Sequence, residues 1–86
     1  MDYIEDLFKK FGDIEIIIES NNGTAISVVN AYGIFNIEKY TSIKDFMVIN
    51  MPDDDFNNIY KPASKNLTNK VLKYFPTAKK VYYNKI

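Results

Sequence analysis

The feature that most constrains the fold of this chain is an alternating run of isoleucines near its start. Ile14, Ile16 and Ile18 occupy every second position between Asp13 and Glu19. Side chains of a β-strand point alternately to its two faces, so this spacing predicts a strand with one buried face. A single strand cannot bury that face alone, and we therefore expect the chain to fold around a β-sheet.

The turn Asn21-Asn22-Gly23 predicts how this strand pairs with the next one, Thr24–Asn30. A two-residue loop would set polar residues beside apolar ones on the core face. A three-residue loop with Gly23 in the left-handed conformation instead matches the apolar residues of the two strands. The predicted pairs are Ile18 with Ile26, Ile16 with Val28, Glu19 with Ala25 and Glu15 with Val29.

Helix and turn signals divide the rest of the chain into further elements. Apolar residues recur at helical spacing in two segments, and in the second of them Leu67, Val71 and Phe75 are expected to face the core. An acidic run after Pro52 is typical of a helix start. The expected elements are a helix from Asp2 to Phe11, a type I turn over Asn30–Gly33, a strand over Ile34–Tyr40, a helical stretch opened by Asp53-Asp54-Asp55, a helix from about Ala63 to Phe75 and a final strand from Lys79 to Ile86.

The segment 42–51 fits two structures. Ile43 and Phe46 have helical spacing after Ser42, whereas Phe46-Met47-Val48-Ile49 is typical of a buried strand. The two β-branched residues of this run, Val48 and Ile49, favour a strand after a short turn. We therefore expect a strand here.

Together these elements predict an α+β fold in a single domain spanning residues 1–86. Its centre is an antiparallel meander of three to five strands. The N-terminal helix and the helix of the C-terminal half are expected to pack on one face of that sheet. A chain of this length supports one hydrophobic core, which argues against a second domain.

The residue types that are absent restrict the chemistry of the protein. The chain contains no His, Cys, Trp, Arg or Gln. Nucleophile systems that depend on His and metal sites that depend on thiolates are therefore excluded. Gly12, Gly23 and Gly33 lie too far apart to form a phosphate-binding loop. We expect no catalytic residues and no cofactor, and hence a protein that is not an enzyme.

One acidic segment resembles the beginning of a calcium-binding loop. Asp53-Asp54-Asp55-Phe56-Asn57 supplies oxygen ligands at the first three ligand positions of the template. The sixth position is Asn58, where the template needs Gly, and the twelfth is Ser64, where it needs Glu. The segment therefore predicts a helix N-terminus, and we expect no metal site.

The composition indicates where the protein works. No run approaches the roughly 18 consecutive apolar residues that cross a bilayer, and the acidic start differs from the basic start of a signal peptide. The absence of Cys fits a reducing compartment, so we expect a cytoplasmic protein. Lys, Asn, Ile, Tyr and Phe, which have A/T-rich codons, make up more than half of the chain. This bias favours a low-GC bacterium, a phage or a mobile element as the source.

Charge is distributed unevenly along the chain. Residues 1–60 contain all eleven acidic residues, whereas residues 61–86 contain seven lysines and no acidic residue. The formal net charge of zero therefore hides an acidic part and a basic part. In the simplest interpretation, the two parts lie side by side in the fold and compensate each other.

Two functional interpretations of these charges compete. An acidic surface would dock a basic partner protein, whereas a basic surface with aromatic rings would bind the phosphates and bases of nucleic acid. The acidic candidates are Glu15, Glu19, Asp53, Asp54 and Asp55. The basic candidates are Lys70, Lys73, Lys79, Lys80, Tyr82 and Tyr83, accompanied by Lys65, Tyr74 and Lys85.

From these observations we expect a small protein that acts by stoichiometric binding to another protein, in the manner of a phage or mobile-element effector or inhibitor. A nucleic-acid-binding module that uses the basic, tyrosine-containing C-terminal third is the alternative. The absence of Arg, which most often reads guanine, and the neutral net charge both disfavour this alternative. No membrane partner is expected, and the sequence does not predict the oligomeric state.

Overall fold

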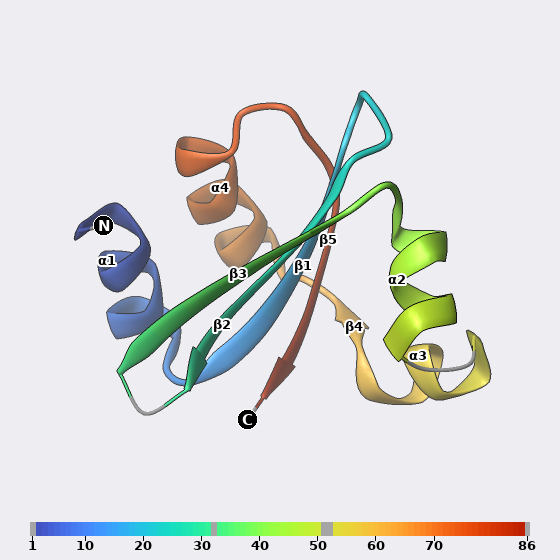
Figure 1. Cartoon of the computed structure of the whole chain (residues 1–86). Coiled ribbons are helices and arrows are strands. Elements are labelled where there is room, and N and C mark those ends of the chain that lie inside the picture. Colours follow the sequence, from blue (N-terminus) through green and yellow to red (C-terminus); the bar gives the residue numbers. More distant parts are fainter. Residues whose placement is uncertain (1, 32, 51–52, 86) are drawn as a thin grey trace.

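The computed structural model of the chain describes residues 2–31, 33–50 and 53–85. These residues form four helices and a five-stranded antiparallel sheet with the strand order β3-β2-β1-β5-β4, which confirms the predicted α+β class (Figure 1). The elements are α1 (Asp2–Phe11), β1 (Ile14–Ser20), β2 (Ala25–Ala31), β3 (Ile34–Tyr40), α2 (Ile43–Asn50), α3 (Asp53–Ile59), β4 (Lys61–Pro62), α4 (Lys65–Tyr74) and β5 (Ala78–Lys85).

The hairpin of β1 and β2 has the predicted three-residue loop. The N–H of Ser20 donates to the carbonyl oxygen of Thr24 at 2.9 Å, and Gly23 has a φ of 85°. A side chain at this φ would be strained, which explains the glycine. The register contains all four predicted pairs, among them Ile18 with Ile26 and Ile16 with Val28.

The second hairpin joins β2 to β3. Gly33 has a φ of 81°, and its N–H donates to Oδ1 of Asn30 at 3.1 Å. The register pairs Ala31 with Ile34, so β2 continues one residue beyond the strand that the sequence predicts. Tyr32, which belongs to the predicted turn, lies outside the described residues. The meander β1-β2-β3 is thereby confirmed, and β5 adds to the other side of β1.

Helices cover both faces of the sheet (Figure 1). We call the face that carries Ile14, Ile16 and Ile18 the α1 face, because α1 and α4 pack on it, as predicted. Leu67 and Val71 of α4 are buried there. The buried core on this face consists of Ile4, Leu7, Phe8, Ile14, Ile16, Ile18, Val28, Leu67 and Val71, with Phe75 packed against it.

The opposite face, which we call the α2 face, carries Glu15, Ile17 and Glu19 of β1. α2 and α3 lie on this side of the sheet (Figure 1). A second buried core forms there from Ile17, Ala25, Ile43, Phe46, Phe56 and Tyr60, with Tyr40, Met47 and Tyr82 packed against it.

The expectation of a strand in residues 42–51 is wrong, because Ile43–Asn50 is helix α2. The hydroxyl oxygen of Ser42 accepts from the N–H of Asp45 at 3.1 Å, which caps the first turn. The helix places Ile43 and Phe46 on one side, where both are buried in the second core. This burial outweighs the strand propensity of the β-branched residues that follow.

The last helix and the last strand occur where the sequence predicts them, with small shifts at their ends, whereas the short strand β4 between α3 and α4 was not predicted. α4 begins at Lys65 after Ser64, whose hydroxyl oxygen accepts from the N–H of Leu67 at 3.2 Å. The final strand spans Ala78–Lys85, and Ile86 lies outside the described residues. Within the described part of the chain, every helix is too short or too polar to cross a bilayer.

Candidate functional site

Strand β3 is an edge of the sheet that exposes large apolar side chains. Ile34 is 65% exposed and Ile37 is 38% exposed, whereas Ile16 and Ile17 in the central strand β1 are fully buried. The register places Ile34 on the α2 face and Ile37 on the α1 face. Each face of β3 therefore exposes one large apolar side chain.

The hydrogen-bond pattern shows which backbone groups of β3 point outward. The N–H of Ser20 donates to the carbonyl oxygen of Thr24, so the backbone N–H and C=O groups of Thr24 point toward β1. This direction alternates from one residue of β2 to the next, and the backbone groups of Ser27 and Val29 therefore point toward β3. Glu38, which lies opposite Ser27, therefore points inward. The residues whose N–H and C=O groups point outward are Phe35, Ile37 and Lys39. Among the described residues, no strand pairs with this side of β3.

A pocket of about 360 Å³ lies beside the beginning of β3, between the sheet and α1. The rings of Phe8 and Phe35 stack at its floor, with centroids 5.4 Å apart and an angle of 20° between the planes. Phe35 contributes to both features, because its ring lines the pocket and its backbone faces the open edge. The polar residues of the pocket are Glu5 and Lys9 of α1, Asp13 and Asn30.

The basic residues proposed from the sequence do not gather on one surface. Lys70 and Lys73 are on α4, whereas Lys79 and Lys80 are on β5, where its pairing with β1 is irregular and skips Lys79. Lys80 lies 3.8 Å from Glu19 on β1. Lys65 and Lys85 are exposed at the start of α4 and at the end of β5.

The proposed stacking rings are partly buried. Tyr82 packs against the second core, where its ring contacts Phe56 with centroids 5.4 Å apart. Tyr83 points to the α1 face and packs against the first core. The two rings therefore stabilise opposite faces of the sheet and do not form one platform for bases.

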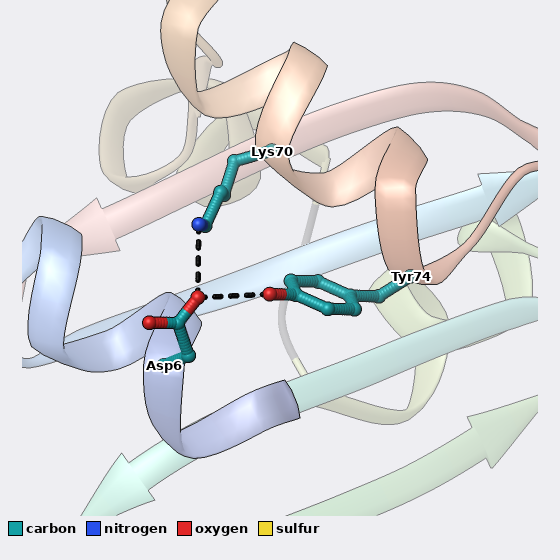
Figure 2. A network of polar contacts seen from close by, with 3 residues as sticks. All are labelled: Asp6, Lys70 and Tyr74. Carbon is teal, nitrogen blue, oxygen red and sulfur yellow. Dashed lines mark hydrogen bonds and ion pairs between the residues drawn. The ribbon is translucent and has the colours of Figure 1, made fainter. Parts of the chain in front are cut away.

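The network of Asp6, Lys70 and Tyr74 joins α1 to α4 (Figure 2). Nζ of Lys70 lies 2.8 Å from Oδ2 of Asp6, and the hydroxyl of Tyr74 donates to the same oxygen at 2.8 Å. The hydrogen bonds from Lys70 and Tyr74 lower the pKa of the Asp6 carboxyl. The same hydrogen bonds to Asp6 raise the pKa of the Lys70 ammonium and of the Tyr74 hydroxyl. Here the acidic and basic parts of the chain compensate each other.

The acidic candidates occupy different environments. The carboxylate of Glu15 accepts from the hydroxyls of Ser27, at 3.0 Å, and Tyr60. Burial, followed by the hydrogen bond to Glu15, raises the pKa of the Tyr60 hydroxyl. Glu19 is mostly buried beside Lys80. Both glutamates therefore serve the packing of the α2 face.

The acidic run at the start of α3 is described in part. Asp55 is exposed on this helix, and for Asp53 and Asp54 only the backbone is described. Among the described residues, no group of three acidic side chains could hold a metal ion.

Comparisons of the chain with protein-family models, with curated proteins and with solved structures found no match in any of the three.

The edge of β3 and the pocket beside it are not among the sites predicted from the sequence. One signal was available, because Ile34 and Ile37 are three positions apart and must lie on opposite faces of a strand. β1 has the same property, because Ile17 lies on the face opposite to Ile14, Ile16 and Ile18, so this pattern does not by itself separate an edge strand from a central one. The stacking of Phe8 on Phe35 could not be read from the sequence, since it requires α1 to lie beside β3.

Proposed function

We propose that this chain is a non-enzymatic binding protein that takes an extended segment of a partner protein as a sixth strand on β3. The observation that carries this proposal is the open edge of β3, with Ile34 and Ile37 exposed on its two faces. Natural sheets usually cover or shorten such edges because they pair with other chains. An edge of seven residues with accessible apolar side chains suits the recognition of an extended peptide.

The edge offers both hydrogen bonds and apolar contacts. The outward N–H and C=O groups of Phe35, Ile37 and Lys39 would pair with the added strand. Each such hydrogen bond contributes roughly 0.5–1.5 kcal/mol net, so the ladder alone gives modest affinity. Burial of Ile34 and Ile37 by the added strand supplies further stabilisation.

This mode of binding suits a protein that acts by occupying its target. Its small size and its lack of His and Cys fit stoichiometric inhibition better than turnover. The A/T-rich codon bias fits an effector of a phage or a mobile element that binds a host protein in the cytoplasm.

A substitution on the outer edge tests the proposal. A displayed library of random peptides about ten residues long, the length of a long strand, is selected on the wild-type protein. Ile37→Pro removes an outward N–H while leaving the pairing with β2, and Ile37→Val serves as the matched control. We expect Ile37→Pro to weaken binding of the selected peptides about tenfold or more, corresponding to about 1.4 kcal/mol. Equal binding by both variants, or a failure to select any peptide, would contradict the proposal.

A second candidate function is nucleic-acid binding, favoured by one observation. Lys10, Lys70 and Lys73 line a groove of about 370 Å³ between α1 and α4. Phosphate binding there would fall steeply with salt, because counterions are released from the nucleic acid. Salt-sensitive retardation of DNA or RNA in a mobility-shift titration, abolished by Lys10→Gln/Lys73→Gln, would favour this function over strand addition.

A further inference from the structure

The residues that line the pocket beside β3 determine which kind of side chain the added strand can place next to it. Residues directly opposite each other in paired strands point to the same face, about 5 Å apart. A side chain opposite Phe35 therefore lies on the α1 face, beside the Phe35 ring and the opening of the pocket. This geometry makes the position opposite Phe35 the anchor of the bound segment.

The floor of the pocket is aromatic. The ring of Phe8 is only 3% exposed and stacks on the half-buried ring of Phe35, so the Phe35 ring is the aromatic surface that a neighbouring group can reach. Such rings accept aliphatic stems and also attract cations placed over their faces. An anchor that combines an aliphatic stem with a cationic end satisfies both properties.

The rim of the pocket is net acidic. It carries Glu5, Lys9 and Asp13, and Lys9 lies 3.5 Å from Glu5 in an exposed pair. Asp13 accepts from the side-chain amide of Asn30 at 3.1 Å. Among the described residues, no lysine lies within ion-pair distance of Asp13. The rim therefore keeps one uncompensated negative charge beside the aromatic floor.

We propose that the segment bound on β3 carries a basic side chain opposite Phe35, with its stem on the Phe35 ring and its charged end at Glu5 and Asp13. This inference rests on the proposed function and names the kind of partner: a strand-forming segment with a basic anchor. Arginine fits better than lysine, because its planar guanidinium stacks on aromatic rings and binds carboxylates through two donors. An acidic anchor would be repelled by the rim, and a purely apolar one would leave the rim carboxylates without a partner.

The test uses the peptides selected from the random library described above. We expect the selected sequences to share one Arg or Lys among β-branched and aromatic residues. Replacing that residue with Met should weaken binding about tenfold, and replacing it with Glu should weaken it further. The loss caused by Met should shrink at high ionic strength, because the rim charges are exposed.

Variants of the protein locate the effect. In Glu5→Gln/Asp13→Asn, the preference for Arg over Met should fall from about tenfold to about threefold or less. Asp55→Asn on α3 removes a negative charge from an exposed site away from β3, and it should leave the preference unchanged. Both variants alter exposed side chains, and circular dichroism melting curves check that each remains folded.

The outcomes separate this inference from the proposed function. Peptides that bind the wild type, lose affinity with Ile37→Pro and show no basic preference would overturn the anchor but leave strand addition intact. Failure to select any peptide would overturn both. If the wild-type protein sediments as a dimer and Ile37→Pro sediments as a monomer, a second copy of the chain is the occupant of β3. This result would also overturn the anchor.

Discussion

β3 and β4 form the two edges of the same sheet, but they differ in length and in backbone donors. β4 consists of Lys61 and Pro62, and both residues are exposed. The N–H of Ala63 donates inward to Val81 at 3.0 Å, so the ring of Pro62 occupies the outward position where another residue would have an N–H. β3 has seven residues, contains no proline and exposes Ile34 and Ile37.

This fold protects one edge of the sheet and leaves the other open. A short strand with Lys and Pro is a common means of preventing edge-to-edge pairing. A long edge with exposed apolar side chains is a template for pairing with another chain. The contrast therefore supports the proposal that an added strand pairs with β3 and not with β4.

The largest expected effect is the difference in the free energy of unfolding between proline at an inward position of β3 and proline at an outward position. Glu38→Pro removes an inward N–H that pairs with β2, and it should lower the free energy of unfolding by roughly 2–3 kcal/mol. Ile37→Pro changes an outward position and should cost about 1 kcal/mol or less. Urea denaturation of both variants, with Glu38→Ala as a control for the side chain, measures the difference. Equal losses for the two prolines would show that the assignment of outward groups is wrong.

A smaller effect is expected at the protected edge. Pro62→Ala restores an outward N–H on β4 and adds conformational freedom to the unfolded chain. Its free energy of unfolding should fall by roughly 0.4–1 kcal/mol, as measured by thermal denaturation. The variant should still bind library peptides only through β3, because two residues are too few to hold an added strand. Peptide binding that survives Ile37→Pro in this background would contradict the contrast between the edges.

The exposed side chains of β3 should matter more for binding than for stability. Ile34→Thr removes an apolar group that is already 65% exposed, so the free energy of unfolding should change by no more than about 0.5 kcal/mol. Peptide affinity should fall in the same variant, because the added strand can no longer bury an isoleucine. Isothermal titration and urea denaturation give the two quantities. A stability loss much larger than this would mean that Ile34 belongs to the core.

The smallest effect concerns α1, the helix that forms one wall of the pocket beside β3. The hydrogen bond with Lys70 is the main cause that lowers the pKa of the Asp6 carboxyl from its ordinary value of 3.8. The ionised carboxylate therefore stabilises the fold at pH values above 3.8, and this stabilisation is lost as the pH falls through the pKa that Asp6 has in the folded state. Asp6→Asn should therefore reduce stability slightly at neutral pH, and the difference should disappear in acid. Because the group is exposed, salt should also diminish it. A difference that persists in acid would indicate a packing defect instead.

Local patterns in the sequence were sufficient for several elements. The alternation of Ile14, Ile16 and Ile18 and the glycine at position 23 predicted the first hairpin and its register, because strand periodicity and a positive φ are properties of a few neighbouring residues. The spacing of Leu67 and Val71 likewise predicted the buried side of α4.

Other features depend on contacts between residues that are distant in the sequence, and these follow from the tertiary structure. Residues 43–50 became a helix because Phe46 could be buried against Phe56 and Tyr60, which follow later in the chain. Lys70 met Asp6 because α4 returns beside α1, and no local pattern encodes that approach.

The candidate site belongs to this second class. β3 is an open edge because β5 pairs with β1 and not with β3, and the pocket exists because α1 stacks Phe8 on Phe35. The sequence determined that a strand with apolar residues on both faces would form over residues 34–40. Whether those residues would be covered or exposed depended on strand order, which follows from the burial of all elements together and not from any single segment.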